Sequence, residues 1–258
     1  MPTALPNLSS FAVILGSAKG KENPVKSIFA PFFNCNKVLQ SICPSKVFPS
    51  KFIHIGGDEC PKGRWKQCAK CQAKARELGL KDDGRHSVEN QLQTYINREM
   101  ERFLHERGRD LIGWDETLEG GLTETALVMS WRGINGGIEA ARQHHRVVMT
   151  PTDYCYIDYY QQKNTFSCPL AIGGYVPVSK VYSFEPLVPE ALTEEEQQYI
   201  LGAQVNLWTE YIASPEHLFY MLLPRLDAIS EVSGAARSRR TSRTSRPSVP
   251  IMVINRHV

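Results

Sequence analysis

The sequence has 258 residues, of which 42% are hydrophobic and 22% are charged. This length suits one large domain or two small ones, and the composition is typical of a globular protein. No apolar run approaches the roughly 20 residues of a membrane-spanning helix. The N-terminus lacks the basic start and long apolar core of an export signal. We therefore expect no membrane partner, and the compartment stays undetermined.

The formal net charge of +3 is unevenly distributed along the chain. Residues 233–250 hold five arginines and no acidic residue, and subtracting those five from +3 leaves −2 for the remainder. The basic character therefore belongs to residues 233–258, which we expect to be a disordered tail rich in arginine and serine. We expect no nucleic-acid partner for the folded part, and RNA binding through the tail is the alternative.

Seven cysteines cannot all pair within one chain. Cys60, Cys68 and Cys71 cluster, and the last two form a CxxC pair. Such a pair can be a redox motif, half of a zinc site or part of a disulfide set. No second CxxC pair occurs, which favours plain thiols or one disulfide over a structural zinc site.

From residue 50 onward, short apolar runs alternate with amphipathic stretches. Residues 51–57, KFIHIGG, predict a buried strand. Residues 86–108 carry apolar side chains at spacings of three and four, which predicts a helix with one apolar face. Ser87 is a suitable N-cap for that helix. Residues 1–46 lack a clear pattern, and we interpret them as an irregular or truncated N-terminal segment.

Four more strands and two more helices follow. Strands are predicted within 109–116, 125–131, 146–158 and 201–211, and helices over 136–145 and 214–232. Ser214 is a good N-cap, and Pro215 lies at the first helical position. A long stretch rich in proline, glycine and tyrosine precedes the last strand. Strands that alternate with helices predict a parallel sheet covered by helices.

Acidic and aromatic residues gather where the predicted strands end. These residues are Asp58 and Glu59, Trp114 with Asp115 and Glu116, Trp131, Tyr156 with Asp158, and Trp208 with Glu210. In (β/α)₈ barrels, the active site is built at the carboxyl ends of the strands. A single tryptophan at a sheet rim is often part of the core. Three of them with polar neighbours are more typical of a sugar-binding wall.

The motifs HIGGDE, GWDE, MSWRG, YCYID and NLWTEY occur in this order. In order and approximate spacing they resemble glycoside hydrolase family 20, the β-N-acetylhexosaminidases, over residues 47–232. The resemblance implies an α/β fold of the (β/α)₈ TIM-barrel type, in which these strands are the fourth to the eighth. The barrel is then incomplete, because residues 1–46 are too few for three β/α units. An arginine and a histidine of the family's first and third strands would be missing.

Asp58 and Glu59 are neighbours, and neighbours on a regular strand point to opposite faces. They can act on one ligand only if the chain leaves strand geometry, which Gly56 and Gly57 permit. An ordinary turn is the alternative interpretation of this stretch. The arrangement also differs from the usual glycosidase pair, in which one carboxylate is the acid and a separate one is the nucleophile.

The resemblance implies substrate-assisted hydrolysis with retention. The 2-acetamido carbonyl of the sugar attacks its own anomeric carbon, and water opens the resulting oxazolinium ion. Glu59 would be the general acid and then the general base. Asp58 would hold the acetamido N–H and stabilise the positive charge, with a depressed pKa beside a raised one for Glu59. The mechanism requires no cofactor and no metal.

The resemblance also implies a set of substrate contacts. These contacts are Trp114, Trp131 and Trp208 around the acetamide, Tyr156 donating to its carbonyl, Glu210 at the 4-hydroxyl and Asp158 near the 6-hydroxyl. Asp115 and Glu116 are expected to be supporting residues, and His54 a buried strand residue that supports the acid pair. The expected partner is a glycan or chitooligosaccharide substrate, and oligomerisation is left open. The alternative function is a catalytically inactive fragment or a weak carbohydrate-binding remnant.

Overall fold

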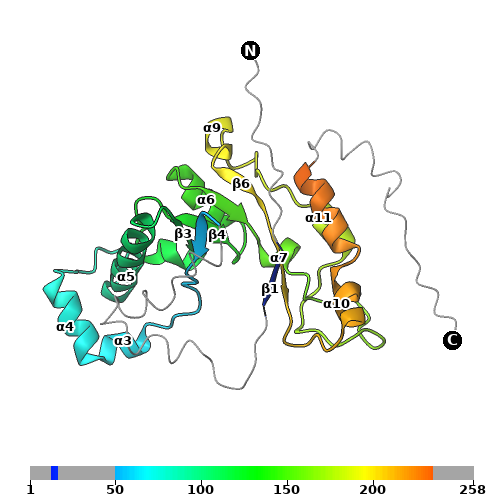
Figure 1. The fold of residues 1–258 in the computed structure, drawn as a ribbon, viewed down its shortest axis with the longest axis horizontal. Coiled ribbons are helices and arrows are strands. Elements are labelled where there is room, and N and C mark those ends of the chain that lie inside the picture. Colours follow the sequence, from blue (N-terminus) through cyan, green and yellow to red (C-terminus); the bar gives the residue numbers. More distant parts are fainter. Residues whose placement is uncertain (1–12, 17–49, 235–258) are drawn as a thin grey trace, which may run out of the picture. The chain divides into compact units, whose positions relative to one another are not determined.

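The computed structural model describes residues 13–16 and 50–234, and the chain divides into two compact units (Figure 1). Unit A contains residues 20–147, and unit B contains residues 1–19 and 148–258. The predicted basic tail lies outside the described residues except for its first two positions, and most of the predicted irregular N-terminal segment lies outside them too. None of the helices in the described ranges is long and apolar enough to cross a membrane.

Unit A is built on three parallel strands, β2 (Phe52–His54), β3 (Asp110–Trp114) and β4 (Leu127–Ser130). Phe52 pairs with Asp110, and Ile112 pairs with Leu127. The predicted strands in these regions are therefore confirmed, but β2 is half-buried rather than buried as predicted. The second of them is shorter than predicted, because the chain turns directly after Trp114 into the 3₁₀ helix η3 (Asp115–Gly120).

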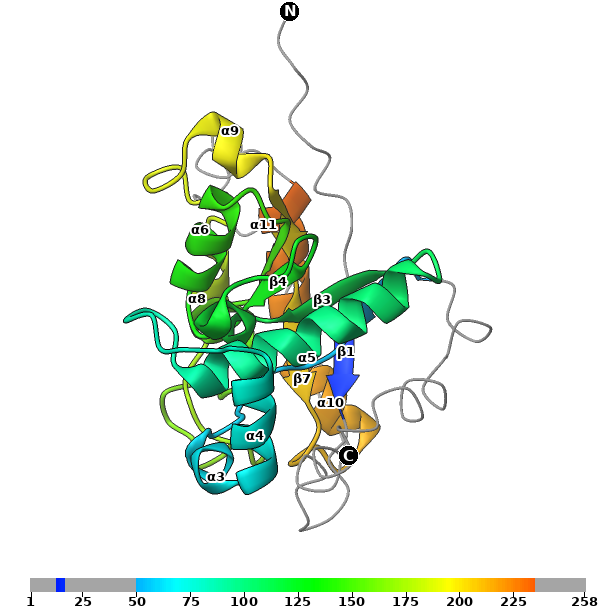
Figure 2. The same cartoon turned by 90° about the vertical axis from the view of Figure 1, so that its left-hand side faces the viewer.

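The helices of unit A are α3 (Gly63–Gln67), α4 (Ala69–Glu77), α5 (Val88–His105) and α6 (Asn135–Arg142). The predicted N-cap of α5 is confirmed, because Ser87 Oγ accepts a hydrogen bond from the Asn90 backbone N–H at 3.2 Å. Helix α5 runs beside β3 (Figure 2), and Leu104 packs there against Leu111 and Ala126. This contact forms the apolar core under the strands.

Helix η3 approaches α5 very closely. A Cβ atom placed on Gly120 would lie 2.0 Å from the Asn90 carbonyl oxygen and 2.4 Å from Thr94 Oγ1. Thr94 Oγ1 also donates a hydrogen bond of 2.9 Å to the Gly121 carbonyl. The two elements are therefore in backbone-to-backbone contact at a position that only glycine fits.

Unit B contains β6 (Ile200–Ala203), β7 (Val205–Trp208) and β1 (Val13–Gly16), together with all but the first residue of β5 (Val147–Met149). Strand β1 pairs in parallel with β7, and it lies in the segment that we interpreted as irregular. The prediction of one strand within 201–211 is wrong. At Gln204, whose N–H donates to the Met149 carbonyl at 2.9 Å, the chain changes its partner from β5 to β1.

The helices of unit B are α7 (Thr152–Cys155), α8 (Val178–Tyr182), α9 (Glu194–Gln197), α10 (Pro215–Leu222) and α11 (Arg225–Gly234). The predicted Ser214 cap is confirmed, because Ser214 Oγ accepts from the His217 N–H at 3.2 Å. The prediction of one helix over 214–232 is wrong. The chain breaks at Pro224, which has no N–H and disfavours helical backbone in the residue before it.

Arg225, the first residue of α11, is fully buried. Its guanidinium donates to the carbonyls of Tyr159 at 2.8 Å, Val176 at 3.1 Å and Met221 at 2.7 Å, and also to the carbonyl of Ile157. Burial lowers the pKa of Arg225 to about 9. One side chain thus joins the loop of residues 157–176 to both C-terminal helices.

We predict that Arg225→Met lowers the free energy of unfolding by on the order of 4 kcal/mol, because several carbonyls lose their donor inside the protein. Urea unfolding measures this change. Arg102→Met is the matched control, since the Arg102 side chain is 66% exposed and forms a salt bridge with Glu99 on the same helix. The control should change stability by less than about 0.5 kcal/mol. Equal effects of the two substitutions would contradict the role of Arg225.

Candidate active site

The sheet of unit A ends in an unusual turn that carries the acid pair. Beyond β2 the ladder continues for two residues, with Ile55 N donating to Ile112 O at 2.9 Å and Trp114 N donating to Gly56 O at 3.0 Å. The backbone φ is then +73° at Gly56, +102° at Gly57 and +45° at Glu59. The chain therefore leaves strand geometry at the predicted place, and Glu59 lies on left-handed backbone.

Two long polar side chains hold this turn in place. Gln93, a buried residue of α5, donates from Nε2 to the Gly57 carbonyl at 2.9 Å. Lys62 donates to the Cys60 carbonyl at 2.7 Å and also to Gln93 Oε1. The backbone is thus fixed immediately before and immediately after Asp58 and Glu59. Sequence reasoning missed both anchors, because a glutamine within a helical pattern gives no sign of what it binds.

The two carboxyl groups differ in exposure. Asp58 is half-buried, whereas Glu59 is exposed. Burial raises the pKa of Asp58, and its own backbone N–H opposes the rise. This direction is opposite to the depressed pKa that we expected for Asp58. The expectation rested on the splitting of pKa values between close carboxylates, whereas the largest influence on this carboxyl is the loss of water.

His54 supports the same turn from the end of β2. The Gly56 N–H donates to His54 Nδ1 at 3.0 Å, so the ring proton lies on Nε2. Burial lowers the pKa of His54 to about 4, which keeps the ring neutral. The ring lies edge-on to Trp114, with 4.8 Å between centroids. His54 Nε2 is buried and has no hydrogen-bond acceptor within the part of the chain that the structure describes.

A polar cluster fixes the second tryptophan of unit A. Trp131 Nε1 donates to Glu116 Oε2 at 2.8 Å, and the Trp131 backbone N–H donates to Asp115 at 3.2 Å. Arg132 Nε donates to Asp115 Oδ1 at 2.6 Å, and the rings of Trp114 and Trp131 are 6.4 Å apart. Asp115 and Glu116 are therefore supporting residues, as expected. Arg132, which sequence reasoning did not single out, links them.

The other predicted contacts belong to unit B. Tyr156 does not end a strand as predicted, because β5 stops at Met149 and α7 intervenes. Tyr156 instead forms an isolated parallel bridge with Asn206 of β7. Burial raises its pKa, and hydrogen bonds to Asn206 and Trp208 oppose this rise. Sequence reasoning missed Asn206, although it lies two residues before the singled-out Trp208.

Asp158 is the most deeply buried of the predicted site carboxyls. Its exposed fraction is 4%, and Oδ1 has no hydrogen-bond partner within the described ranges. Burial, helped by the charge of Glu210, raises the pKa of Asp158 to about 7, and its own N–H and Arg225 oppose this. A buried oxygen without a donor is costly, so this atom is a candidate acceptor for a ligand hydroxyl. Glu210 itself is exposed.

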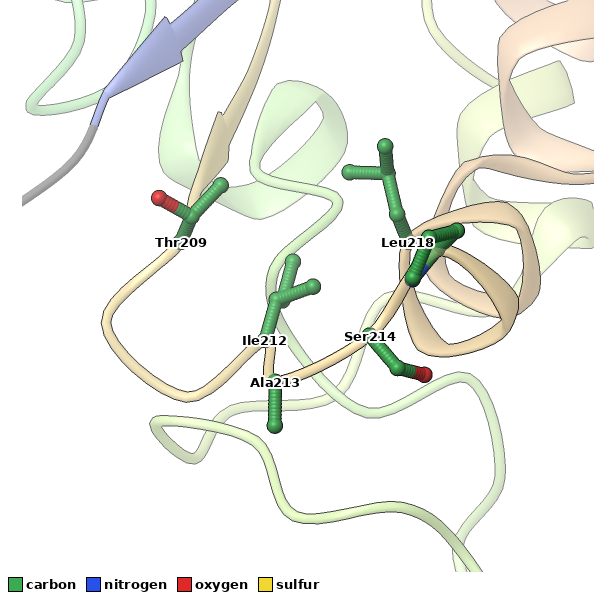
Figure 3. Close-up of a pocket in the computed structure, with 6 residues that line it drawn as sticks. Thr209, Ile212, Ala213, Ser214 and Leu218 are labelled. Atoms are coloured by element: carbon green, nitrogen blue, oxygen red, sulfur yellow. The ribbon is translucent and has the colours of Figure 1, made fainter.

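A hollow of about 310 Å³ lies between the end of β7 and the start of α10. It is lined by Thr209, Ile212, Ala213, Ser214, Pro215 and Leu218, and Ile212 and Leu218 extend to the same side (Figure 3). Glu210 belongs to the same loop, but none of the predicted site residues lines this hollow. Within the described ranges, no group of three or more His, Cys, Asp or Glu side chains could hold a metal ion.

Comparisons with known proteins agree on one family. Residues 17–235 match the profile of "Glycosyl hydrolase family 20, catalytic domain". A β-hexosaminidase of Porphyromonas gingivalis is 48% identical over 197 residues, which are 76% of this chain and 24% of that protein. One of Vibrio furnissii is 32% identical over 200 residues, which are 77% of this chain and 31% of that protein.

Solved structures give the same result. The Vibrio harveyi GH20 exo-β-N-acetylglucosaminidase in complex with N-acetylglucosamine aligns with a TM-score of 0.68 at 29% identity, over 83% of this chain and 33% of that chain. The Flavobacterium johnsoniae chitobiase aligns with a TM-score of 0.62 at 28% identity, over 86% of this chain and 31% of that chain. The predicted α/β fold of the barrel type is confirmed. The chain spans about a quarter to a third of the length of these relatives.

We predict that the stability of Asp158→Asn, measured relative to that of wild type at the same pH, is higher at pH 8 than at pH 4. The folded pKa of about 7 lies above the unfolded value of about 3.9, so the stability from this carboxyl is full below pH 4 and is lost as pH rises through 7. Asparagine stays neutral, so the variant should gain on the order of 2–4 kcal/mol over wild type between these pH values. Urea unfolding at each pH measures the gain.

Asp153→Asn is the matched control for this experiment, because the Asp153 side chain is 73% exposed in the same unit. It should shift stability equally, and only slightly, at both pH values. A pH-independent effect of Asp158→Asn would show that this carboxyl has the same pKa in the folded and the unfolded protein, which would contradict the raised pKa.

Proposed function

Because the chain belongs to glycosyl hydrolase family 20, we propose that it hydrolyses terminal, non-reducing β-linked N-acetylhexosamine, GlcNAc or GalNAc, from glycans. The observation that carries the proposal is the turn from Gly56 to Glu59, in which Gly56, Gly57 and Glu59 have positive φ. It presents two adjacent carboxyls on anchored backbone, which an ordinary strand end does not do. A turn without chemical function would not require a buried glutamine and a lysine to fix both of its sides.

The proposed mechanism uses the different exposure of the two acids. Glu59 is exposed and therefore suited to exchange protons, first with the leaving oxygen and then with water. Asp58 is half-buried and suited to a fixed contact with the acetamido N–H. The acetamide carbonyl closes on the anomeric carbon, and the bond to the leaving oxygen breaks as Glu59 protonates that oxygen. Water then opens the ring, and Glu59 takes up its proton.

The raised pKa of Asp58 fits this sequence of steps. A half-buried carboxylate without bound sugar is destabilised by lost hydration. The acetamido N–H and the positive charge of the oxazolinium ion both favour the ionised form, so they lower this pKa during the reaction. Asp58 then interacts more strongly with the charged intermediate than with the neutral substrate. Such a difference is what accelerates a chemical step.

The substrate contacts are proposed residue by residue. Trp114 and Trp131 offer apolar ring surface to the acetamide methyl group, and the indole N–H of Trp131 is already bound to Glu116. In unit B, taken by itself, Tyr156 and Trp208 are the proposed aromatic contacts to a sugar. Asp158 accepts from a sugar hydroxyl through its unpartnered Oδ1, and exposed Glu210 binds a second hydroxyl.

We predict that Glu59→Gln lowers kcat by about 100- to 10,000-fold for a β-linked GlcNAc disaccharide, because the sugar leaving group must be protonated. A 4-nitrophenyl glycoside should lose less in the step that forms the oxazolinium ion, since nitrophenolate leaves without a proton. Released GlcNAc and released nitrophenol measure the two rates. Glu106→Gln, a control at the exposed end of α5, should keep wild-type rates.

Two results would count against the proposal. The first is an equal loss for both leaving groups, because Glu59 would then not be the acid. The second is an unchanged rate when the 2-acetamido group is replaced by the less nucleophilic trifluoroacetamido group. A folded wild type that binds GlcNAc but releases none from either substrate would instead favour the carbohydrate-binding alternative.

We predict that Gln93→Leu lowers kcat at least about tenfold with a smaller change in KM, because the Gly57 carbonyl and Lys62 lose their bridge and the acid pair is no longer fixed. Steady-state kinetics with the disaccharide measure both constants. Gln91→Leu is the matched control on the same helix, since Gln91 bonds to the carbonyls of Lys81 and His86. Equal kinetic losses in the two variants would contradict a positioning role for Gln93.

A further inference from the structure

Unit A carries a pair of thiols that the proposed hydrolysis does not use. Cys68 is the N-cap of the nine-residue helix α4, and its Sγ accepts the Cys71 backbone N–H at 3.5 Å. Both residues are half-buried, both are free thiols, and Ala69 and Lys70 between them are exposed. The two thiols therefore lie one helical turn apart at the start of α4, and both are partly exposed.

The charge around this pair favours a thiolate. Residues 61–76 contain six lysines and arginines and no acidic residue. The two hydrogen bonds from Cys71, and then the charge of Lys70, lower the pKa of Cys68. Burial and the bond to Cys68 raise the pKa of Cys71 to about 11. The pair is therefore asymmetric, with an attacking sulfur at the helix start and a protonated sulfur behind it.

The geometry permits closure to a disulfide. Side chains three residues apart at a helix start have Cβ atoms about 5–6 Å apart, and a disulfide needs about 3.5–4.5 Å. Cys68 lies outside the helix on extended backbone, with ψ of 112°, so a small rotation there closes the gap. Helix α4 itself is fixed by Gln72, which donates to the Trp65 carbonyl at 3.0 Å and to Glu89 at 2.9 Å.

We propose that Cys68 and Cys71 form a thiol–disulfide exchange site for small disulfides that carry carboxylates. The Cys68 thiolate attacks one sulfur of such a disulfide, the S–S bond breaks, and one thiolate leaves and takes a proton from water. Cys71 gives its proton to solvent and attacks Cys68 Sγ, which expels the second thiolate. Two cysteines are oxidised to one intramolecular disulfide, and the small disulfide is reduced to two thiols.

The test is the reaction of the full chain with oxidised glutathione, followed by peptide mass spectrometry. Wild type should form the Cys68–Cys71 disulfide. Cys71→Ser should accumulate glutathione on Cys68, because no second thiol resolves it, and Cys68→Ser should react at least about tenfold more slowly at Cys71. Serine caps helices well, so these variants keep the start of α4. Cys60→Ser is the control and should keep the wild-type rate, since burial raises the pKa of Cys60.

The charge preference has its own readout. Wild type should react faster with oxidised glutathione than with cystamine, a cationic disulfide. Lys70→Gln should reduce the ratio of these two reaction rates. Equal trapping rates in Cys71→Ser and Cys68→Ser, or first modification at Cys60, would overturn the proposal. The proposal would also be overturned if one equivalent of Zn²⁺ protected both thiols from modification and if the pair exchanged with disulfides no faster than Cys60. The pair would then be a metal-binding half-site.

Discussion

The arrangement of unit A depends on two backbone carbonyls, those of Gly56 and Gly57. The first is held by the last residue of β3 through Trp114 N, and the second by the side chain of Gln93 from α5. Strand, helix and turn are therefore fixed to one another within two residues of the acid pair. Left-handed backbone is unfavourable for a residue such as Glu59. It persists because these partners leave the turn no alternative path.

Unit B fixes its own carboxyl in a similar way. Arg225 donates to the carbonyls of Ile157 and Tyr159, the residues on either side of Asp158. In both units, a long polar side chain binds the backbone next to an acid rather than the carboxyl itself. The backbone at the acid is thus fixed by groups other than the carboxyl oxygens. Direct pairing with a cation would position it equally well but would also occupy those oxygens and depress its pKa.

Sequence patterns predicted the elements that local rules govern. The apolar spacing of α5, the Ser87 and Ser214 caps and the polar residues after β2, β3 and β4 follow from periodicity and capping chemistry. The breaks at Gln204 and Pro224 were missed, the first because a change of strand partner leaves no local signal. The second had a signal in the proline itself. The raised pKa of Asp58 could not be predicted, because burial is a property of the assembled unit.

The contact at Gly120 has a consequence for how this sequence can change over time. A side chain there would meet the Asn90 carbonyl at 2.0 Å, and backbone cannot move aside as a flexible side chain does. Any replacement must push η3 away from α5, the helix that also carries Gln93. A half-buried glycine is thereby tied to the geometry of an acid pair many residues earlier. In random mutagenesis, Gly120 should tolerate substitution almost as poorly as Asp58 and Glu59, because of backbone packing rather than catalysis.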